Sequence, residues 1–327
     1  MKTLHLPTFG KPTVAPELIE SPAPEPGPGQ VLVALEAAPI NPSDLLLIRG
    51  WYGHRPSLPA VLGTEGVGRV IAVGQDVDPA RTGERVLILP TLNHGTWQDQ
   101  VAIDERDAIP VDPAADPLQL AMLGVNPVTA DLLLRLFVDL PPDAWVGQTG
   151  GSSAVGRYVI ALARRAGLRT LNVVRRPEVA AELLDAGADA VAVSGPDLGD
   201  QLKKALGGER MALLLDPVAG DVVTELAPWL AHGGTIVSYG GMSGGMVSVA
   251  PADLIFRDLQ VRAFWQKHWL DAAPHDQIVS AYARLAPLVA DGTLHAPVAA
   301  TYPLKQHREA LTHASASDRT GKVLFAW

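Results

Sequence analysis

The chain has 327 residues, a formal net charge of −9 and no cysteine. At roughly 100–200 residues per domain the length predicts two domains, and 47% hydrophobic residues indicate a globular chain without an apolar run long enough to span a membrane. The acidic balance argues against nucleic acid as a partner, and the missing thiols exclude disulfides and sulfur-ligated zinc. The first residues, 1–7, show neither an apolar signal core nor a transit peptide, so we expect a cytoplasmic location.

The first 110 residues are typical of a β-rich, barrel-like domain. Seven prolines within residues 1–30 exclude a long helix there and allow only edge strands and turns. Apolar and β-branched runs then predict strands at 31–37, 63–73 and 84–89, with glycine and Asp-Pro turns between them.

From residue 117 the pattern becomes helical, and beyond residue 144 apolar runs alternate with helical stretches. Strands are predicted at 144–148, 169–174, 190–193, 211–215, 235–238 and 259–264. Helices are predicted at 117–123, 127–137, 154–166, 177–186 and 273–290. Such alternation predicts a doubly wound, Rossmann-type parallel sheet covered on both faces, hence an α/β fold. The expected boundaries are 1–118 for the β-rich domain, 119–295 for the nucleotide-binding domain and 296–327 for a return to the first domain.

A glycine turn lies between the first predicted strand and helix of this second domain. Gly151, Ser153 and Gly156 occupy the three glycine positions of a G-x-G-x-x-G fingerprint. Small residues there let a pyrophosphate approach the backbone and the helix N-terminus. An isolated match would equally suit an ordinary glycine turn, but the strand–turn–helix context favours a dinucleotide. The candidate binding residues are Gly151, Ser152, Ser153, Ala154, Val155 and Gly156.

Two arginines follow the second strand of this domain. NAD-preferring folds place an acidic residue there to bind the ribose 2′-hydroxyl, whereas this chain has Arg175 and Arg176. Guanidinium groups bind a 2′-phosphate through charge-assisted hydrogen bonds, so the sequence predicts NADPH as cofactor. The alternative is that both arginines are solvated residues at a strand end.

The segment Gly63–Gly68 resembles the G-H-E-x-x-G motif of the medium-chain dehydrogenase/reductase superfamily. In its zinc alcohol dehydrogenases the histidine is a metal ligand, and here Thr64 takes that place. The first ligand there is a cysteine in a strand-end turn, which here contains Asn41 and Pro42. We therefore expect no catalytic metal, and Glu65 is interpreted as a structural residue that binds backbone amides.

Further motifs resemble the zinc-free 2-enoyl thioester reductases, the mitochondrial enoyl-CoA reductase group. They are Asn41–Asp44, Arg49–Gly53, Gly124–Ala130, Ser153–Gly156, Gly167–Arg175, Gly233–Met242, Leu254–Leu259 and Phe264–Trp265. Ala154 replaces a usual glycine, and Trp51 stands where the family is often small or polar. The resemblance implies a Rossmann domain plus a GroES-like barrel.

It also implies an NADPH-dependent oxidoreductase that reduces the C2=C3 double bond of a 2-enoyl thioester, carried by CoA or acyl carrier protein. Hydride reaches Cβ and a proton reaches Cα. Tyr52 matches the catalytic tyrosine, which would hydrogen-bond the thioester oxygen and supply the proton. Thr129 would reach the nicotinamide amide. Without the resemblance, a loop tyrosine such as Tyr52 is more often simply packed or exposed.

Several of the remaining implied cofactor residues have an alternative interpretation. Asn126 before Pro127 is also a good helix cap, and the loop after the fifth strand is also an ordinary turn. The residues that follow the Phe-Trp pair, Lys267, His268 and Trp269, are equally suited to a dimer contact, and the late lysine is also suited to an exposed surface. These residues are Asn41, Asn126, Tyr239, Gly240, Gly241, Met242, Phe264, Trp265 and Lys322.

Two other functions stay open at this point: a quinone or free enone reductase of the same superfamily, and a non-catalytic NADPH-binding regulatory or structural protein. For assembly, the sixth strand at 259–264 is apolar and ends in aromatics, so we expect a homodimer formed through it.

Overall fold

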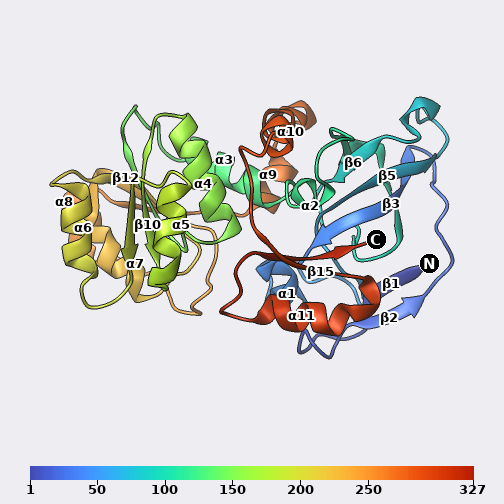
Figure 1. Cartoon of the computed structure of the whole chain (residues 1–327), viewed down its shortest axis with the longest axis horizontal. Coiled ribbons are helices and arrows are strands. Elements are labelled where there is room, and N and C mark those ends of the chain that lie inside the picture. Colours follow the sequence, from blue (N-terminus) through green and yellow to red (C-terminus); the bar gives the residue numbers. More distant parts are fainter. The chain divides into compact units, whose positions relative to one another are not determined.

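The computed structural model describes residues 1–327, which divide into two compact units (Figure 1). The first unit comprises Met1–Val128 and Leu270–Trp327, and the second comprises Thr129–Trp269. No helix combines the length and the apolarity needed to cross a bilayer.

The first unit is mainly antiparallel β-structure. Its larger sheet has the order β15-β16-β3-β5-β6-β8, with β7 also paired to β3, and its smaller sheet has the order β2-β1-β4. The strands are β1 (Lys2–Leu6), β2 (Glu17–Glu20), β3 (Gln30–Pro39), β4 (Ala60–Val61), β5 (Gly66–Val73), β6 (Arg85–Ile88), β7 (Gln100–Asp104), β8 (Ala108–Pro110), β15 (Val298–Tyr302) and β16 (Lys322–Ala326). Strand β16 pairs with β3, so the C-terminal tail contributes to the larger sheet of the first unit.

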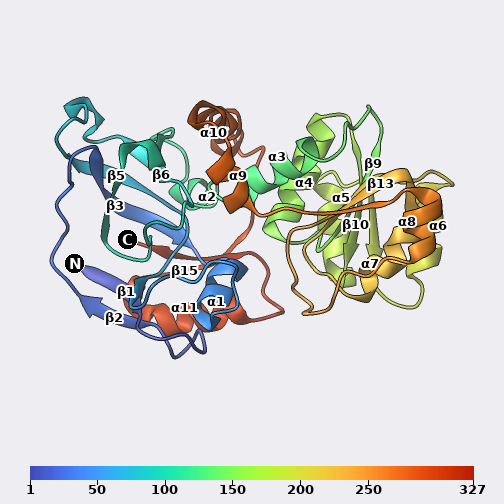
Figure 2. The ribbon, with the colours of Figure 1, turned by 180° about the vertical axis from the view of Figure 1, so that it is seen from behind.

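Four helices lie in the first unit: α1 (Pro42–Arg49), α2 (Pro117–Leu120), α10 (His275–Ala290) and α11 (His307–Ser315). Strand β1 and helices α1 and α11, which can be followed in Figure 2, share one apolar core. In this core the rings of Trp97 and Phe325 meet edge-on, with centroids 5.2 Å apart. The strands of the larger sheet enclose a second core.

Helix α1 occupies a segment that the sequence analysis interpreted as a turn, so that interpretation is wrong. Pro42 stands at the start of the helix, and the Asp44 carboxylate accepts the Asn41 backbone N–H at 2.7 Å. Gly50 ends the helix in the left-handed region, at φ +73°. These residues are ordinary signals for the start and the end of a helix. They were not used in the prediction, because the segment was compared with the strand-end turn that carries a zinc ligand in the zinc alcohol dehydrogenases.

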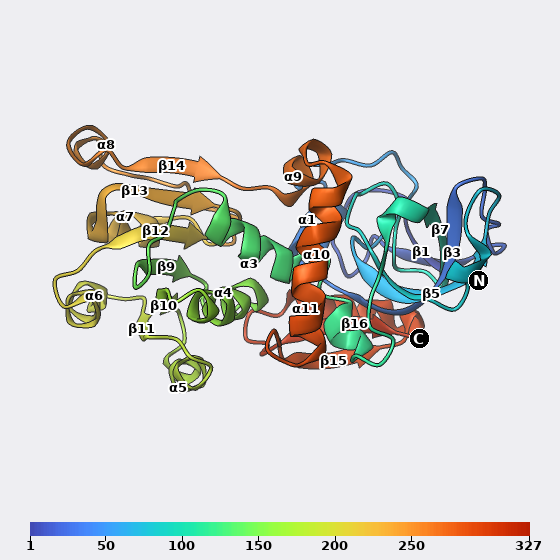
Figure 3. The ribbon, with the colours of Figure 1, turned by 90° about the horizontal axis from the view of Figure 1, so that it is seen from above.

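The second unit is a six-stranded parallel sheet of order β11-β10-β9-β12-β13-β14, visible edge to edge in Figure 3. Its strands are β9 (Trp145–Thr149), β10 (Arg169–Val174), β11 (Ala190–Val193), β12 (Met211–Asp216), β13 (Leu230–Ser238) and β14 (Gln260–Ala263). Its helices are α4 (Ala154–Arg165), α5 (Ala180–Asp185), α6 (Leu198–Leu206), α7 (Asp221–Leu226) and α8 (Pro251–Arg257). Helices α3 (Asn126–Arg135) and α9 (Gln266–Ala272) run across the two unit boundaries.

Alternate residues of β10 show how the helices cover both faces of this sheet. Leu171 and Val173 pack in the core that contains α6 and α7, whereas Val174 packs in the core that contains α4 and α5. The predicted doubly wound sheet is therefore confirmed, and its strand order is that of dinucleotide-binding folds.

The structure places the unit boundaries elsewhere than residues 119 and 295. Residues 119–128 and 270–295 belong to the first unit, where α2 packs against α10. The Gln119 side chain exchanges two hydrogen bonds with the backbone of Ala296, at 3.0 and 3.1 Å, and the Tyr282 hydroxyl donates to the Gly124 carbonyl at 2.8 Å. The sequence changes from strands to helices near residue 117, but the first of these helices packs within the first unit. The change therefore does not mark the boundary between the two units.

Candidate active site

The turn after β9 is shaped by two close backbone approaches. A Cβ at Gly151 would meet the Asn172 Cβ at 2.9 Å, and a Cβ at Gly156 would meet the Gly151 carbonyl oxygen at 2.5 Å. Ser153 begins α4 as its N-cap, its hydroxyl accepting the Gly156 N–H at 3.1 Å. Ser152 lies in the turn, and Ala154 and Val155 form the start of the helix. The serine at the middle fingerprint position is thus the N-cap of α4.

The other predicted loops of this unit follow strands that end at the same edge of the sheet. Val173 pairs with Thr149, and Asp216 pairs with Ser238, both in parallel register. The glycine turn, the arginine pair 175–176 and the loop 239–242 therefore all lie at the carboxyl ends of the strands, where open α/β sheets bind ligands.

Asp216, which was not among the predicted site residues, orders this edge through four hydrogen bonds. Its carboxylate accepts the Thr149 hydroxyl at 2.5 Å and the backbone N–H groups of Val218 and Ala219 at about 3 Å. A Cβ at Gly240 would meet the Pro217 carbonyl oxygen at 2.7 Å, so the loop after β12 supports the loop after β13. The available signal was an acidic residue that directly follows a buried apolar run.

Three aromatic residues of the second unit have distinct surroundings. The Tyr239 hydroxyl is buried and has no hydrogen-bond partner, and burial raises the pKa of this phenol. Phe264 is buried against Phe137, with ring centres 6.3 Å apart, whereas Trp265 packs edge-on against His268. Met242, in contrast, is 63% exposed. An unpartnered buried hydroxyl at this edge of the sheet is a position for a ligand hydrogen bond.

In the first unit, three predicted residues meet in one buried polar cluster with Glu65. Asn41 donates to a Glu65 carboxylate oxygen at 2.7 Å, and Asn126 donates to the Asn41 amide oxygen at 3.3 Å. The Lys322 ammonium donates to that same Asn41 oxygen. Asn126 is the first residue of α3, and its amide nitrogen is directed into this cluster. Lys322 is buried, so the surface reading of this lysine is wrong.

Burial sets the ionisation of this cluster. It raises the pKa of Glu65 to about 7, against the opposing attraction of Lys322. It raises the pKa of Asp44 to about 6, although the hydrogen bond from Thr64 opposes the shift. It lowers the pKa of Lys322 to about 8, against the attraction of Glu65. The cluster therefore changes its charge near neutral pH.

The donor set does not fit zinc at this position. Glu65 accepts the Val125 backbone N–H at 2.7 Å, as expected for a structural carboxylate, and its other oxygen is bound by Asn41. Thr64 donates to Asp44, and a lysine ammonium completes the cluster. Zinc prefers imidazole and thiolate ligands, and nowhere in the chain do three or more His, Cys, Asp or Glu residues gather as a possible metal site.

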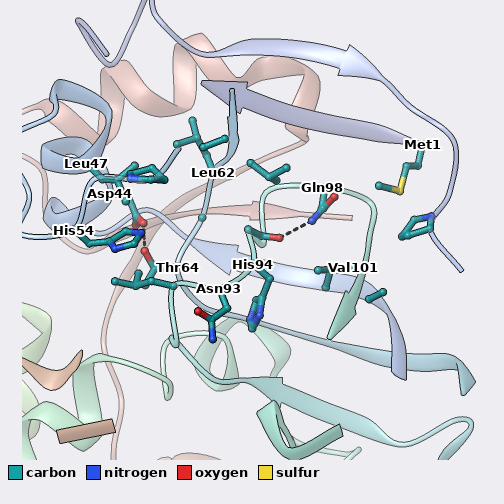
Figure 4. A pocket seen from close by; sticks show the side chains of 18 of the residues that line it. Met1, Asp44, Leu47, His54, Leu62, Thr64, Asn93, His94, Gln98 and Val101 are labelled. Atoms are coloured by element: carbon teal, nitrogen blue, oxygen red, sulfur yellow. Dashed lines mark hydrogen bonds between the residues drawn. The ribbon is translucent and has the colours of Figure 1, made fainter. Parts of the chain in front are cut away.

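Tyr52 lies half-buried in the loop between α1 and β4. The same loop contributes His54 to a cavity of about 450 Å³ within the first unit. Asp44, Thr64, Asn93 and His94 also line this cavity (Figure 4). Thr129, the other predicted catalytic residue, is buried in α3.

Comparisons with known proteins agree with this architecture. Residues 27–113 match the family "Alcohol dehydrogenase GroES-like domain", and residues 154–278 match "Zinc-binding dehydrogenase". The mitochondrial enoyl-[acyl-carrier-protein] reductase of Caenorhabditis elegans is 42% identical over 253 residues, which cover 76% of this chain and 72% of the relative. The chain belongs to this reductase family, within the medium-chain dehydrogenase/reductase superfamily.

Solved structures of the same superfamily cover all of this chain. A putative NADPH:quinone reductase from Bacillus thuringiensis has a TM-score of 0.93 at 27% identity, over 98% of its own chain. The complex of Etr1p with NADP and crotonyl-CoA has a TM-score of 0.86 at 25% identity, over 99% of its own chain. The predicted resemblance is thus confirmed, as is the GroES-like nature of the barrel.

Proposed function

We propose that this protein reduces the C2=C3 double bond of 2-enoyl thioesters with NADPH. The observation that carries the proposal is the 42% identity with a curated enoyl-[acyl-carrier-protein] reductase. The similar structure of Etr1p in complex with NADP and crotonyl-CoA supports the same cofactor and substrate class.

The second unit contains residues suited to hold the cofactor. The glycine turn leaves room for a pyrophosphate beside the helix N-terminus, and Arg175 and Arg176 supply positive charge for a 2′-phosphate. The unpartnered Tyr239 hydroxyl and the buried Thr129 are further candidate contacts. When bound, NADPH supplies a hydride to Cβ of the substrate.

The chain's own residues must then manage the charge that develops on the thioester oxygen. In this proposal the Tyr52 phenol hydrogen-bonds that oxygen and provides the proton for Cα, because a phenol is a protonated donor at neutral pH. The Asn41–Glu65–Asn126–Lys322 cluster is proposed to hold Asn41 in a fixed orientation toward the cofactor. A fixed donor loses less free energy to reorganisation than a mobile one.

A quinone or free enone reductase is the second candidate, and the 0.93 TM-score with a putative quinone reductase favours it. The decisive experiment compares NADPH consumption with crotonyl-CoA and with a naphthoquinone. We expect turnover with the thioester and at least tenfold lower kcat/KM with the quinone. The reverse preference would support the quinone reductase, and NADPH binding without turnover of either would support a non-catalytic protein.

A homodimer through β14 also remains our proposal. This strand is at the edge of the parallel sheet, and all four of its residues are exposed. Beside it in sequence, α8 leaves Ile255 70% and Phe256 76% exposed. Such an open edge with exposed apolar neighbours is suited to pairing with a second copy.

The cytoplasmic location stays a prediction, since the curated relative is described as mitochondrial.

A further inference from the structure

Two loops at the carboxyl ends of β12 and β13 are joined along their backbones. We call residues 216–220 the β12 loop and residues 239–246 the β13 loop. Four backbone hydrogen bonds of 2.9–3.1 Å connect them, and their donor and acceptor pairs are Tyr239 N–H to Asp216, Met242 N–H to Pro217, Ser243 N–H to Val218 and Gly220 N–H to Met246. The position of the β13 loop is therefore set by the β12 loop.

The β12 loop is in turn held by the carboxylate of Asp216, which is fully buried. The carboxylate accepts the Val218 N–H at 3.0 Å and the Ala219 N–H at 3.0 and 3.1 Å. Ala219 has a φ of +63°, in the left-handed region that a residue with a Cβ rarely adopts. A strained residue keeps such a conformation only where its surroundings impose it, and here the two acceptor oxygens of Asp216 supply that constraint.

The place of these loops in the sheet assigns them to one half of a dinucleotide. Strand β9 has β10 on one side and β12, followed by β13, on the other. In the proposed function the glycine turn after β9 binds the pyrophosphate, and Arg175 after β10 binds the 2′-phosphate of the adenosine half. A dinucleotide spans the carboxyl ends of strands on both sides of such a turn, so the nicotinamide half belongs at the ends of β12 and β13.

The glycine turn after β9 is held by different contacts. Gly151 packs closely against Asn172 of β10, with no room for a Cβ between them. Thr149, the last residue of β9, donates its hydroxyl to Asp216, but its backbone is fixed by parallel pairing with Val173. The half of the site that faces the pyrophosphate and the 2′-phosphate is therefore supported independently of the β12 and β13 loops.

We propose that Asp216 is a positioning residue for the nicotinamide half of the cofactor. It fixes the β12 loop, which fixes the β13 loop and with it Tyr239, whose buried hydroxyl has no hydrogen-bond partner within the protein. A donor that is already in place loses less free energy to reorganisation when a ligand binds. This inference rests on the proposed function and adds to it a division of the cofactor site into two separately supported halves.

The test measures the affinities of two ligands by isothermal titration calorimetry. One is NADPH, and the other is 2′-phospho-ADP-ribose, which lacks the nicotinamide ring. For Asp216→Asn, in which an amide donor replaces one acceptor oxygen, the Kd of NADPH should rise about tenfold or more. The Kd of 2′-phospho-ADP-ribose should change by less than about twofold. Asp221→Asn, at an exposed acidic residue of the same unit, is the matched control and should alter neither affinity.

Gly240→Ala tests the same support without altering Asp216, and it decides the question if Asp216→Asn does not fold. The new Cβ would meet the Pro217 carbonyl oxygen at 2.7 Å and displace the β13 loop from the β12 loop. This variant should raise the Kd of NADPH about tenfold and leave that of 2′-phospho-ADP-ribose nearly unchanged. Equal losses for both ligands, or no loss for either, would overturn the inference. Because both affinities are measured without an enoyl thioester, a lack of turnover with crotonyl-CoA would overturn the proposed function alone.

Discussion

Replacing Lys322 by methionine should destabilise the fold in a strongly pH-dependent way. Lys322 is the cation that opposes the raised pKa values of Glu65 and Asp44. At pH 8 both carboxyl groups are ionised in the wild type, and leaving buried charges without their partner costs about 3–5 kcal/mol. At pH 5 both are below their pKa values of about 7 and about 6, so they are largely protonated. At pH 5 the substitution should therefore lower the free energy of unfolding by only about 1 kcal/mol, the typical contribution of one hydrogen bond.

The direction in which the stability of the wild type changes with pH follows from the same raised carboxyl pKa values. A folded state that raises a carboxyl pKa binds protons more tightly than the unfolded state does. The contribution of Glu65 to stability is therefore fully present below pH 4.5 and is lost as the pH rises through about 7. Lys322→Met should extend this decrease to higher pH, because the ammonium no longer opposes the upward shift of the Glu65 pKa.

The assay is the free energy of unfolding from urea titration at pH 5 and at pH 8. Lys305→Met, at an exposed lysine in the same unit, is the control and should change neither value by more than about 0.5 kcal/mol. Adding Glu65→Gln to Lys322→Met removes one stranded charge, so it should recover part of the loss at pH 8. An equal loss at both pH values, or no recovery in the double variant, would refute the reasoning.

Tyr52→Phe should lower turnover on crotonyl-CoA about 10²–10³-fold at unchanged NADPH affinity, and near-wild-type turnover with rate-limiting chemistry would exclude Tyr52 as the donor. Arg175→Ala should raise KM for NADPH roughly 10–100-fold and leave that for NADH nearly unchanged, as steady-state kinetics would reveal. Activity should survive chelators, with no stoichiometric zinc by elemental analysis; zinc-dependent recovery after chelation would contradict this. Light scattering should give twice the chain mass of 34.5 kDa, and a persistent monomer would contradict the β14 dimer.

The sequence predicted the parallel sheet well because its strands are buried on both faces. Strands β10 and β11 begin and end at the predicted residues, since short apolar runs bounded by polar turns leave few alternative bounds. The position of the candidate cofactor loops at one edge of the sheet followed from the same pattern, because the carboxyl ends of parallel strands meet there.

Long-range polar contacts were the part that the sequence could not predict. Lys322 and Asn41 lie 281 positions apart, and no periodicity marks a lysine that will be buried against an amide. The role of Asp216 was hidden for a related reason, because the Thr149 hydroxyl that its carboxylate accepts belongs to a different strand, 67 positions earlier. Such contacts depend on the completed fold and not on local composition.

The placement of β16 between β15 and β3 has a consequence for the order in which the chain can fold. The second unit is one uninterrupted segment, Thr129–Trp269, so every strand of its sheet is available once that segment has left the ribosome. The first unit must wait, since the strand that pairs with residues 37–39 of β3 is also the one that delivers Lys322 to Glu65. Until then this end of β3 lacks its partner strand and the carboxylates lack their cation. We therefore expect the nucleotide-type unit to form first during synthesis and the barrel to close only at the end.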